Sequence, residues 1–485
     1  MPNNYWMKTP LLDALIESAG KPHAAFYAPG HKQGKGINDK IEDLIGAAVF
    51  RADLPELPEL DNLFAPQGAI AEAQKLAAMT FGAEKTWFLI NGSTCGIVAA
   101  ILATCSSGEK IILPRNIHQS AIAGLVLSGA IPIFINPEYD RQAGLTHNVT
   151  PETVRQTLEK HPDTKAVMML HPTYQGVCSD LKAIAKIVHQ YDIPLLVDEA
   201  HGAHFAFHTD LPPSAMSVGA DLTVQSTHKV LSAMTQASML HLQGNRVREH
   251  QISKALQLVQ STSPSYLLLA SLDAARQQMA TQGEELMSKT IALAERARQI
   301  AQIPNLSVFE PEIQPGCQYF DPTRLTVDVA KLGITGFEAD EILHERLGVT
   351  CELPLLQHLT FIISPGNSTE DIQKLIQACQ ILSRTKVNSH NAKRSPKGQP
   401  LAISYQSIIS PREAYFAATE TIPMSEADNR LCGELICPYP PGIPLLMPGE
   451  MITTEAIEYL KQILAAGGTI TGCNDPTLET IQILR

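Results

Sequence analysis

The sequence predicts an α/β protein built on a large, mainly parallel β-sheet. From Ile70 to Gly244, short apolar runs alternate with amphipathic stretches, which is the pattern of a parallel sheet covered by helices. Two of the runs end in polar clusters, at Asp198 and at Ser226. Short apolar, β-branched runs that close on polar residues are typical of buried parallel strands.

The elements follow from these runs in order along the chain. The predicted strands are 86–90, 110–113, 131–135, 166–171, 195–198, 222–225 and 237–242. Helices fit between them, and in 181–191 the apolar side chains share one face. The stretch 271–302 contains no proline and is rich in Ala, Glu and Arg, so we expect a long helix there. The next elements form a smaller α+β unit, with strands at 325–329 and 359–364 and helices at 336–347 and 370–384.

These patterns divide the chain into five parts. Residues 385–400 are polar, basic and poor in apolar side chains, as expected of a linker or an exposed loop. The expected parts are an N-terminal segment (1–69), a large domain (70–300), a small α+β domain (301–384), the linker (385–400) and a C-terminal domain (401–485).

Composition excludes several classes of function. The 485 residues carry a net charge of −12, which argues against binding to nucleic acid or to an anionic membrane surface. No apolar stretch reaches the roughly 18 residues that a membrane helix needs, and the N-terminus lacks the pattern of a signal peptide. The nine cysteines form no Cys-x-x-Cys pair or metal cluster. We therefore expect a cytoplasmic protein with reduced thiols and no metal.

Asp198 and Lys229 are the candidate reactive residues. Both follow predicted strands, and the carboxyl ends of parallel strands form the ligand crevice of an α/β sheet. A lysine that can form a Schiff base, beside an acid that keeps a pyridine nitrogen protonated, is what pyridoxal phosphate requires. Taken singly, Lys229 is equally consistent with a surface lysine, and Asp198 with a helix cap.

Two further segments fit the same cofactor. Residues 91–96 (Asn-Gly-Ser-Thr-Cys-Gly) follow a predicted strand and open an apolar helix, so their backbone N–H groups and hydroxyls can cradle a phosphate. His118 follows another strand, where its ring can stack on a pyridine ring. Considered by itself, segment 91–96 is equally typical of an ordinary helix N-terminus. His118 by itself is equally consistent with a structural histidine.

Taken together and in order, these blocks resemble the ornithine/lysine/arginine decarboxylases, which are fold-type-I enzymes dependent on pyridoxal phosphate, in their shorter bacterial form. The resemblance spans nearly the whole chain. The matching blocks are 26–34 (Phe-Tyr-Ala-Pro-Gly-His-Lys-Gln-Gly), 56–61 (Glu-Leu-Pro-Glu-Leu-Asp), 91–96, 115–118 (Arg-Asn-Ile-His), 198–201 (Asp-Glu-Ala-His), 226–229 (Ser-Thr-His-Lys) and 439–450.

The resemblance implies a role for each matching residue. It implies Lys229 for the Schiff base, Asp198 on the pyridine nitrogen and His118 stacked on the ring. The other cofactor contacts that it implies are Ser93, Thr94, Ser226 and His228 at the phosphate, Ala200 on the opposite ring face, and His201 at the border of the site. Glu352 falls where larger members place an acid facing the substrate's distal cation, and His31 lies in a block expected to reach toward a neighbour's site.

The implied reaction is decarboxylation of arginine, lysine or ornithine to the amine, a polyamine precursor, with arginine narrowly first. A homodimer is the minimum assembly that the resemblance implies. The residues leave two alternatives open. Another fold-type-I activity, such as an aminotransferase or aldolase, would reuse Asp198 and Lys229. A non-catalytic homologue that binds polyamines has no need of a buried lysine.

Overall fold

The computed structural model describes residues 5–385, 409–439 and 441–485. The chain divides into two compact units. The first comprises Met1–Ala103, Asp198–Thr209 and Pro213–Met287, and the second comprises Thr104–Val197, Asp210–Pro212 and Ser288–Arg485. Apart from Thr385, the expected linker 385–400 lies outside the described residues.

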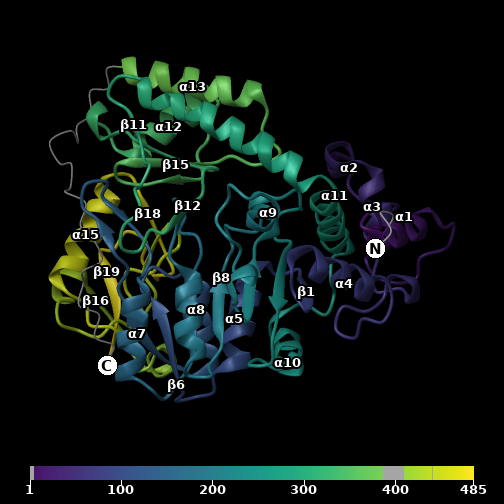
Figure 1. Cartoon of the computed structure of the whole chain (residues 1–485), viewed down its shortest axis with the longest axis horizontal. Coiled ribbons are helices and arrows are strands. Elements are labelled where there is room, and N and C mark those ends of the chain that lie inside the picture. Colours follow the sequence, from purple (N-terminus) through teal and green to yellow (C-terminus); the bar gives the residue numbers. More distant parts are fainter. Residues whose placement is uncertain (1–4, 386–408, 440) are drawn as a thin grey trace. The chain divides into compact units, whose positions relative to one another are not determined.

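The predicted α/β class is confirmed by a seven-stranded sheet with the strand order β1-β10-β9-β8-β6-β2-β3 (Figure 1). Strand β2 is parallel to β3 and β6, whereas β10 is antiparallel to both β1 and β9. Every one of these strands lies within two residues of its predicted bounds. They are β1 (Lys85–Leu89), β2 (Lys110–Pro114), β3 (Ile131–Ile135), β6 (Thr164–Leu170), β8 (Leu195–Asp198), β9 (Leu222–Gln225) and β10 (Ser238–Leu242).

The first unit contains β1, β9 and β10 and the helices around them. Its N-terminal helix α1 is held by buried side chains of α11, because Asp273 accepts a hydrogen bond from the backbone N–H of Leu11 at 2.9 Å. The helices are α1 (Pro10–Gly20), α2 (Asp39–Ile45), α3 (Ala47–Ala52), α4 (Ala69–Phe81), most of α5 (Gly92–Thr104), α9 (Thr227–Val230), α10 (Glu249–Val259) and most of α11 (Tyr266–Ala297), with short 3₁₀ turns η2 (Pro58–Leu60), η3 (Phe205–Phe207) and η4 (Met216–Val218).

The long helix begins and ends earlier than predicted. Helix α11 starts at Tyr266, two residues after Pro264, and gives way at Arg298 to the 3₁₀ turn η5 (Arg298–Gln302). Tyr266 is fully buried and its hydroxyl donates to the backbone oxygen of Asp61 at 2.6 Å, so tertiary packing sets this start.

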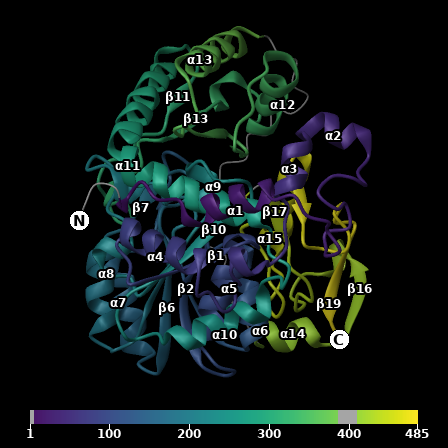
Figure 2. The same ribbon diagram turned by 90° about the vertical axis from the view of Figure 1, so that its right-hand side faces the viewer.

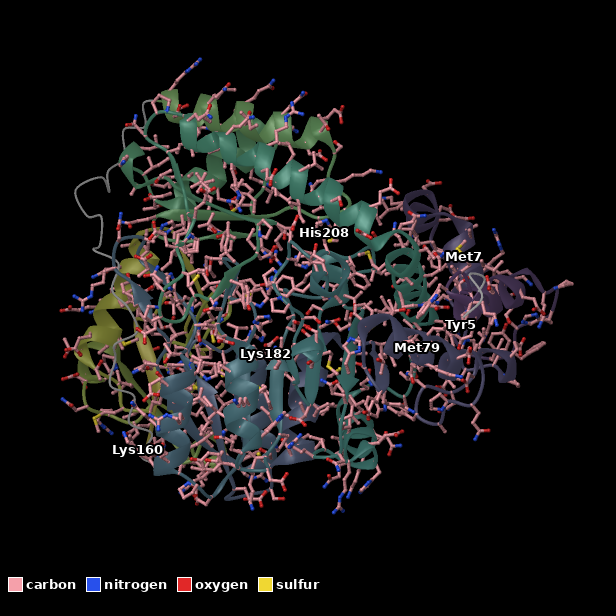
Figure 3. The ribbon with its side chains drawn as sticks, viewed as in Figure 1. Tyr5, Met7, Met79, Lys160, Lys182 and His208 are labelled. Atoms are coloured by element: carbon pink, nitrogen blue, oxygen red, sulfur yellow. The ribbon has the colours of Figure 1, made fainter. Side chains whose placement is uncertain are left out.

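In the second unit, α6 (Gln119–Ser128), α7 (Pro151–Lys160) and α8 (Leu181–His189) accompany strands β2, β3, β6 and β8. Helix α8 buries Ile184 and Val188, as its apolar spacing predicted, and packs against α7. Lys160 and Lys182 are exposed and lie on the solvent sides of α7 and α8 (Figure 3). This region also contains two short two-stranded antiparallel sheets. One pairs β4 (Tyr139–Asp140) with β5 (Leu145–Thr146), and the other pairs β7 (Val177–Cys178) with β12 (Tyr319–Phe320).

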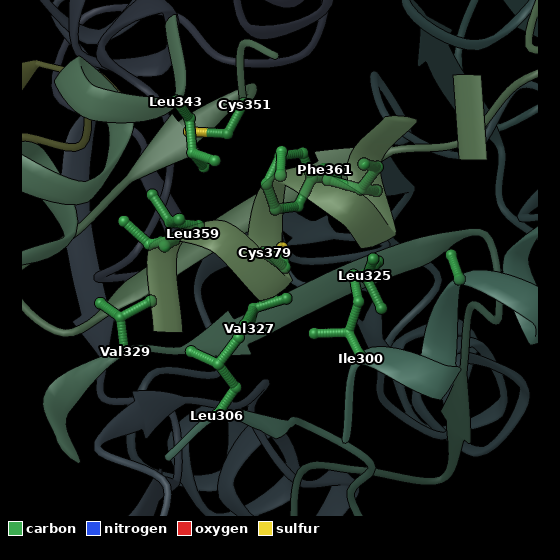
Figure 4. Packing of buried hydrophobic residues seen from close by; sticks show 14 of the residues in the cluster. Ile300, Leu306, Leu325, Val327, Val329, Leu343, Cys351, Leu359, Phe361 and Cys379 are labelled. Atoms are coloured by element: carbon green, nitrogen blue, oxygen red, sulfur yellow. The ribbon is translucent and has the colours of Figure 1, made fainter. Parts of the chain in front are cut away.

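The predicted smaller α+β elements are also present in the second unit. A four-stranded antiparallel sheet has the order β11-β13-β15-β14, and α12 and α13 pack with it around one apolar core (Figure 4). The bounds are β11 (Ser307–Val308), β13 (Arg324–Asp328), η6 (Ala330–Leu332), α12 (Gly336–Leu347), β14 (Leu353–Pro354), β15 (His358–Ile362) and α13 (Thr369–Arg384).

The C-terminal segment has its own apolar core, which includes Met424, Ile436, Leu446 and Leu460. Strand β16 pairs antiparallel with β19, which ends next to the C-terminus (Figure 2). The elements are α14 (Pro411–Phe416), β16 (Thr419–Pro423), η7 (Met424–Glu426), β17 (Cys437–Tyr439), α15 (Thr454–Ala465), β18 (Thr469–Thr471) and β19 (Thr480–Leu484).

Candidate active site

Asp198 ends strand β8 and is buried in the first unit. Its side chain is 3% exposed, and Oδ1 accepts a hydrogen bond from the backbone N–H of Ala200 at 3.1 Å. The chain continues from Asp198 into a turn, so this residue does not cap a helix. Burial raises the pKa of the Asp198 carboxyl, and the charge of Lys229 opposes that shift. A buried carboxyl and a lysine thus share one electrostatic environment.

Lys229 lies on the single-turn helix α9, which directly follows strand β9. Its Nζ atom is 3.0 Å from Nε2 of His201, whose side chain is only 3% exposed. His201 is three residues beyond Asp198 on the turn after β8. The ends of two strands therefore bring together three of the residues named from the sequence: Asp198, His201 and Lys229.

Two hydroxyl groups meet at the start of helix α5. The Ser226 hydroxyl donates to the Ser93 hydroxyl at 2.7 Å, and Ser93 lies in the first turn of this helix. The helix can approach the sheet because residue 96 is glycine: a Cβ there would lie 2.7 Å from Leu89 and 2.8 Å from Val224. Thr94 is exposed in the same turn.

The orientation of the His228 ring is set by a backbone carbonyl. Its Nδ1 atom is 3.0 Å from the oxygen of Ala237, so Nδ1 carries the proton and donates it. Burial lowers the pKa of His228, and Lys229 lowers it further, while the Ala237 contact raises it. The neutral ring then presents a lone pair at Nε2, and an anion at that atom would favour the imidazolium.

A network of buried polar side chains links Glu199, Gln225, His241 and Thr86. It was not predicted from the sequence. The Gln225 amide nitrogen donates to Glu199 Oε2 at 2.7 Å, and the Gln225 oxygen is 3.0 Å from His241 Nε2. The Thr86 hydroxyl is 2.8 Å from His241 Nδ1. Burial raises the pKa of Glu199 to about 8 and lowers that of His241 to about 3. Both groups are therefore uncharged at neutral pH. The sequence signal was a polar residue directly after Asp198 and another directly before Ser226.

His118 belongs to the second unit, where it caps helix α6. Its Nδ1 atom accepts the backbone N–H of Ser120 at 3.2 Å. The other side of the ring faces Gly442: a Cβ there would lie 3.3 Å from His118 Nε2. The backbone oxygen of Gly442 also accepts the N–H of Gln119 at 3.1 Å. Part of the proline-rich segment 439–450 thus touches His118.

The remaining predicted residues have other neighbours. His31, in the first unit, has Nε2 at 3.1 Å from Asp53 Oδ2. Glu352, in the second unit, is exposed just before β14, and its charge acts on the buried guanidinium of Arg324. Arg324 lies at 3.5 Å from Asp321, so this arginine already faces an acid of its own unit.

A separate cavity of about 180 Å³ lies within the second unit. Its wall includes the rings of Tyr139, Tyr174, Phe337 and Tyr459. Among the described residues that line it there is no Asp, Glu, Lys or Arg. A basic amino acid would lose its hydration there without gaining a charged partner, so this cavity does not suit such a substrate.

The described residues form neither a metal site nor a membrane-spanning helix. Residues 5–385, 409–439 and 441–485 contain no group of three or more His, Cys, Asp or Glu side chains placed to hold a metal ion. Within the same ranges, each helix is too short or too polar to span a bilayer.

Solved structures define the class of fold. The lysine decarboxylase LdcF of Francisella novicida superposes with a TM-score of 0.86 at 22% identity, covering 99% of this chain and 81% of the other. An alanine–glyoxylate aminotransferase from Nostoc sp. superposes with a TM-score of 0.52 at 16% identity, covering 65% of this chain and 87% of the other. The fold is thus that of fold-type-I enzymes, as expected.

Sequence comparisons define the family. A model described as "Orn/Lys/Arg decarboxylase, major domain" matches residues 9–371, and one for the C-terminal domain of that family matches residues 402–475. The chain belongs to the Orn/Lys/Arg decarboxylase family. It is 39% identical to an arginine decarboxylase of Bacillus subtilis (strain 168) over 99% of this chain and 98% of the relative. It is 25% identical to the lysine decarboxylase LdcA of Pseudomonas aeruginosa over 93% of this chain and 75% of the relative.

Proposed function

We propose that the chain decarboxylates a basic L-amino acid with the help of pyridoxal phosphate, and that arginine is its preferred substrate. The observation that carries this proposal is the placement of Lys229 against His201 and in the field of the buried Asp198, in a member of this decarboxylase family. Similarity to a relative named arginine decarboxylase over almost the full length of both chains supports the choice of arginine.

The donor groups of the first unit fit pyridoxal phosphate. The cofactor has an aldehyde, a pyridine nitrogen and a phosphate, and each needs a different partner. Lys229 supplies an amine, Asp198 a buried acid, and the Ser93–Ser226 pair supplies hydroxyls at the N-terminus of α5, where the helix dipole favours an anion. When bound, the cofactor supplies an electron sink for the bond that breaks at Cα.

The protein's own residues carry the remaining tasks. Lys229 is the nucleophile toward the aldehyde, and Asp198 holds the proton of the ring nitrogen. Ser93, Thr94, Ser226 and His228 would hold the phosphate, with His228 as an imidazolium. His118 and Ala200 would contact the pyridine ring, and His201 would border the site.

We assign the substrate's distal cation to Glu352, with His31 as a second contact. Glu352 is an exposed acid, and a carboxylate can accept two parallel hydrogen bonds from a guanidinium group. The net charge of −12 favours the approach of cationic substrates over anionic ones.

Family membership supports two broader assignments, and the cysteines support a third. We expect a homodimer or higher homo-oligomer, with each site built at a subunit interface. We expect the amine product to feed polyamine biosynthesis. A cytoplasmic location is supported by the nine cysteines, which all remain free thiols.

The cofactor assignment is tested by trapping. Protein loaded with pyridoxal phosphate is reduced with borohydride, digested, and the modified peptide is identified by mass spectrometry. The proposal predicts one modified lysine, Lys229, and no modification in Lys229→Ala. Labelling of a different lysine in the wild type would refute the assignment.

A further inference from the structure

The contact between Lys229 and His201 joins a reactive amine to a basic nitrogen. Nζ and Nε2 are 3.0 Å apart, which is hydrogen-bond distance. An ammonium group can only donate, so Nε2 must present its lone pair to it. In this arrangement His201 is already placed to receive a proton from Nζ.

Both partners are held by elements that leave the contact little freedom. His201 lies on the turn after β8, and Lys229 on the turn of helix after β9. His201 is 3% exposed, so water has little access to its ring. Proton exchange with solvent is thereby restricted, and the neighbouring side chain becomes the nearest exchange partner.

We propose that His201 is the proton acceptor of Lys229. Nε2 first takes one proton from the Nζ ammonium, which gives an imidazolium and frees the electron pair of Nζ. As that pair forms a bond to an aldehyde carbon, the π bond of the C=O group breaks and its electrons pass to the aldehyde oxygen. When the Nζ–C bond breaks again, the C=O π bond re-forms, the electron pair returns to Nζ, and Nζ takes the proton back from Nε2. This inference rests on the proposed role of Lys229 as the nucleophile, and it gives His201 a catalytic role beyond bordering the site.

The charged groups around the pair favour this assignment. Asp198 and His228 are two titratable side chains whose charges interact with Lys229. Asp198 is assigned to the pyridine nitrogen, and its Oδ1 is already engaged by the N–H of Ala200. His228 has its Nδ1 on the Ala237 carbonyl. Of these three side chains, His201 is the one whose lone pair lies at hydrogen-bond distance from Nζ.

The test uses the full chain without added cofactor, so that it does not depend on decarboxylation. The protein is treated with formaldehyde and cyanoborohydride over the range from about pH 5.5 to 8, around the ordinary pKa of histidine. The methylation rate of Lys229 is measured by peptide mass spectrometry relative to exposed Lys182 on α8. His201→Gln keeps a hydrogen-bond acceptor but cannot hold a proton, which separates positioning from proton transfer.

We expect the Lys229/Lys182 rate ratio in the wild type to fall as His201 becomes protonated at low pH. In His201→Gln the ratio should be at least about tenfold lower at neutral pH and should no longer show that step. His204→Gln is the matched control, since His204 is almost as exposed as His201, at 2%, and its ring contacts that of Phe205 with a centroid distance of 4.7 Å; this variant should match the wild type.

A His201→Gln protein with the wild-type ratio and the same pH step would overturn the inference. If the His201→Gln protein does not fold, His201→Gly with and without added imidazole decides the question. Imidazole should restore the ratio, and failure to restore it in a folded variant would equally refute proton transfer. Loss of the step together with absent decarboxylation would leave this inference standing and reject the proposed function instead.

Discussion

Arg115 and Glu450 form a buried ion pair in the second unit although they are 335 positions apart in the sequence. The Nη2–Oε2 distance is 3.1 Å, and the two side chains are 1% and 2% exposed. Arg115 also donates to the backbone oxygens of Pro444 and Leu445, and Glu450 accepts the N–H of Met447. The pair therefore fixes the segment that carries Gly442 against the end of strand β2, close to His118.

Breaking this pair should destabilise the protein strongly. We expect Glu450→Ala to lower the free energy of unfolding by about 3 kcal/mol or more, because it leaves a buried guanidinium without its acid. The matched control is Glu420→Ala, which breaks an exposed pair with Arg430 at 3.1 Å and should cost less than about 1 kcal/mol. Urea denaturation of both variants gives the comparison. If both variants lose the same free energy of unfolding, the buried pair contributes no more to stability than the exposed pair does.

Gly442 should be required for the orientation of His118. Its φ is +82°, and a Cβ would press on His118 Nε2 at 3.3 Å. Gly467 also has a positive φ, of +92°, but a Cβ built there would lie 3.7 Å from its nearest neighbour, Phe337 Cβ. Both Gly→Ala changes should cost about 1 kcal/mol in stability, whereas only Gly442→Ala should weaken pyridoxal phosphate binding, by about tenfold. The affinity for pyridoxal phosphate is measured by fluorescence titration. If Gly442→Ala and Gly467→Ala bind it equally well, Gly442 has no role in cofactor binding.

Glu199 should make stability depend on pH. Its pKa is about 8 in the folded protein, against an ordinary value of 4.5. The folded state therefore holds more protons on Glu199 than the unfolded state between these values, so the contribution of Glu199 to the free energy of unfolding is largest at low pH and is lost as pH rises through about 8. From about pH 6 to 9 we expect the wild type to lose on the order of 2 kcal/mol more than Glu199→Gln.

Denaturant unfolding at the two pH values measures this difference. Exposed Glu249 provides the control, because Glu249→Gln should follow the wild type within about 0.5 kcal/mol. The Gln225 amide nitrogen already donates to Glu199 Oε2, so an ionised Glu199 keeps this hydrogen bond and the Gln225–His241 contact need not change. A parallel pH profile in Glu199→Gln would show that another group dominates.

Glu352 should control the affinity for substrate and not for cofactor. Loss of a charge-assisted contact costs about 1.5–3 kcal/mol, so Glu352→Ala should raise KM for the basic amino acid at least about tenfold. The affinity for pyridoxal phosphate should stay unchanged. Glu345→Ala, an exposed acid on the nearby helix α12, is the control in steady-state assays. An unaltered KM in Glu352→Ala would remove this residue from the site.

Much of the sheet could be predicted because apolar runs that end in polar residues mark strand ends. The runs before Asp198 and Ser226 are β8 and β9 as expected. The direction of a strand is not written in such a run, so the antiparallel course of β10 required the structure. The start of α11 depended on the burial of Tyr266, which is a tertiary effect.

The proximity of Asp198, His201 and Lys229 was predictable, because each lies close in sequence to a strand end and strand ends meet at one edge of a sheet. The Glu199–Gln225–His241–Thr86 chain was not predicted, although Glu199 and Gln225 also lie at strand ends, because its members come from separate strands and each resembles an ordinary polar residue. The Arg115–Glu450 pair is separated by most of the chain, and no local pattern links its partners. Tertiary packing brings such partners together, and local sequence motifs do not predict these contacts.

The most direct measurement of the central claim is carbon dioxide release, with identification of the amine. Protein loaded with pyridoxal phosphate is given arginine, lysine or ornithine separately, with Lys229→Ala as the inactive control. The account predicts carbon dioxide and the matching amine, fastest from arginine, and none from Lys229→Ala. No release from any of the three substrates by wild-type protein that carries the cofactor on Lys229 would contradict it and assign the fold to a different reaction.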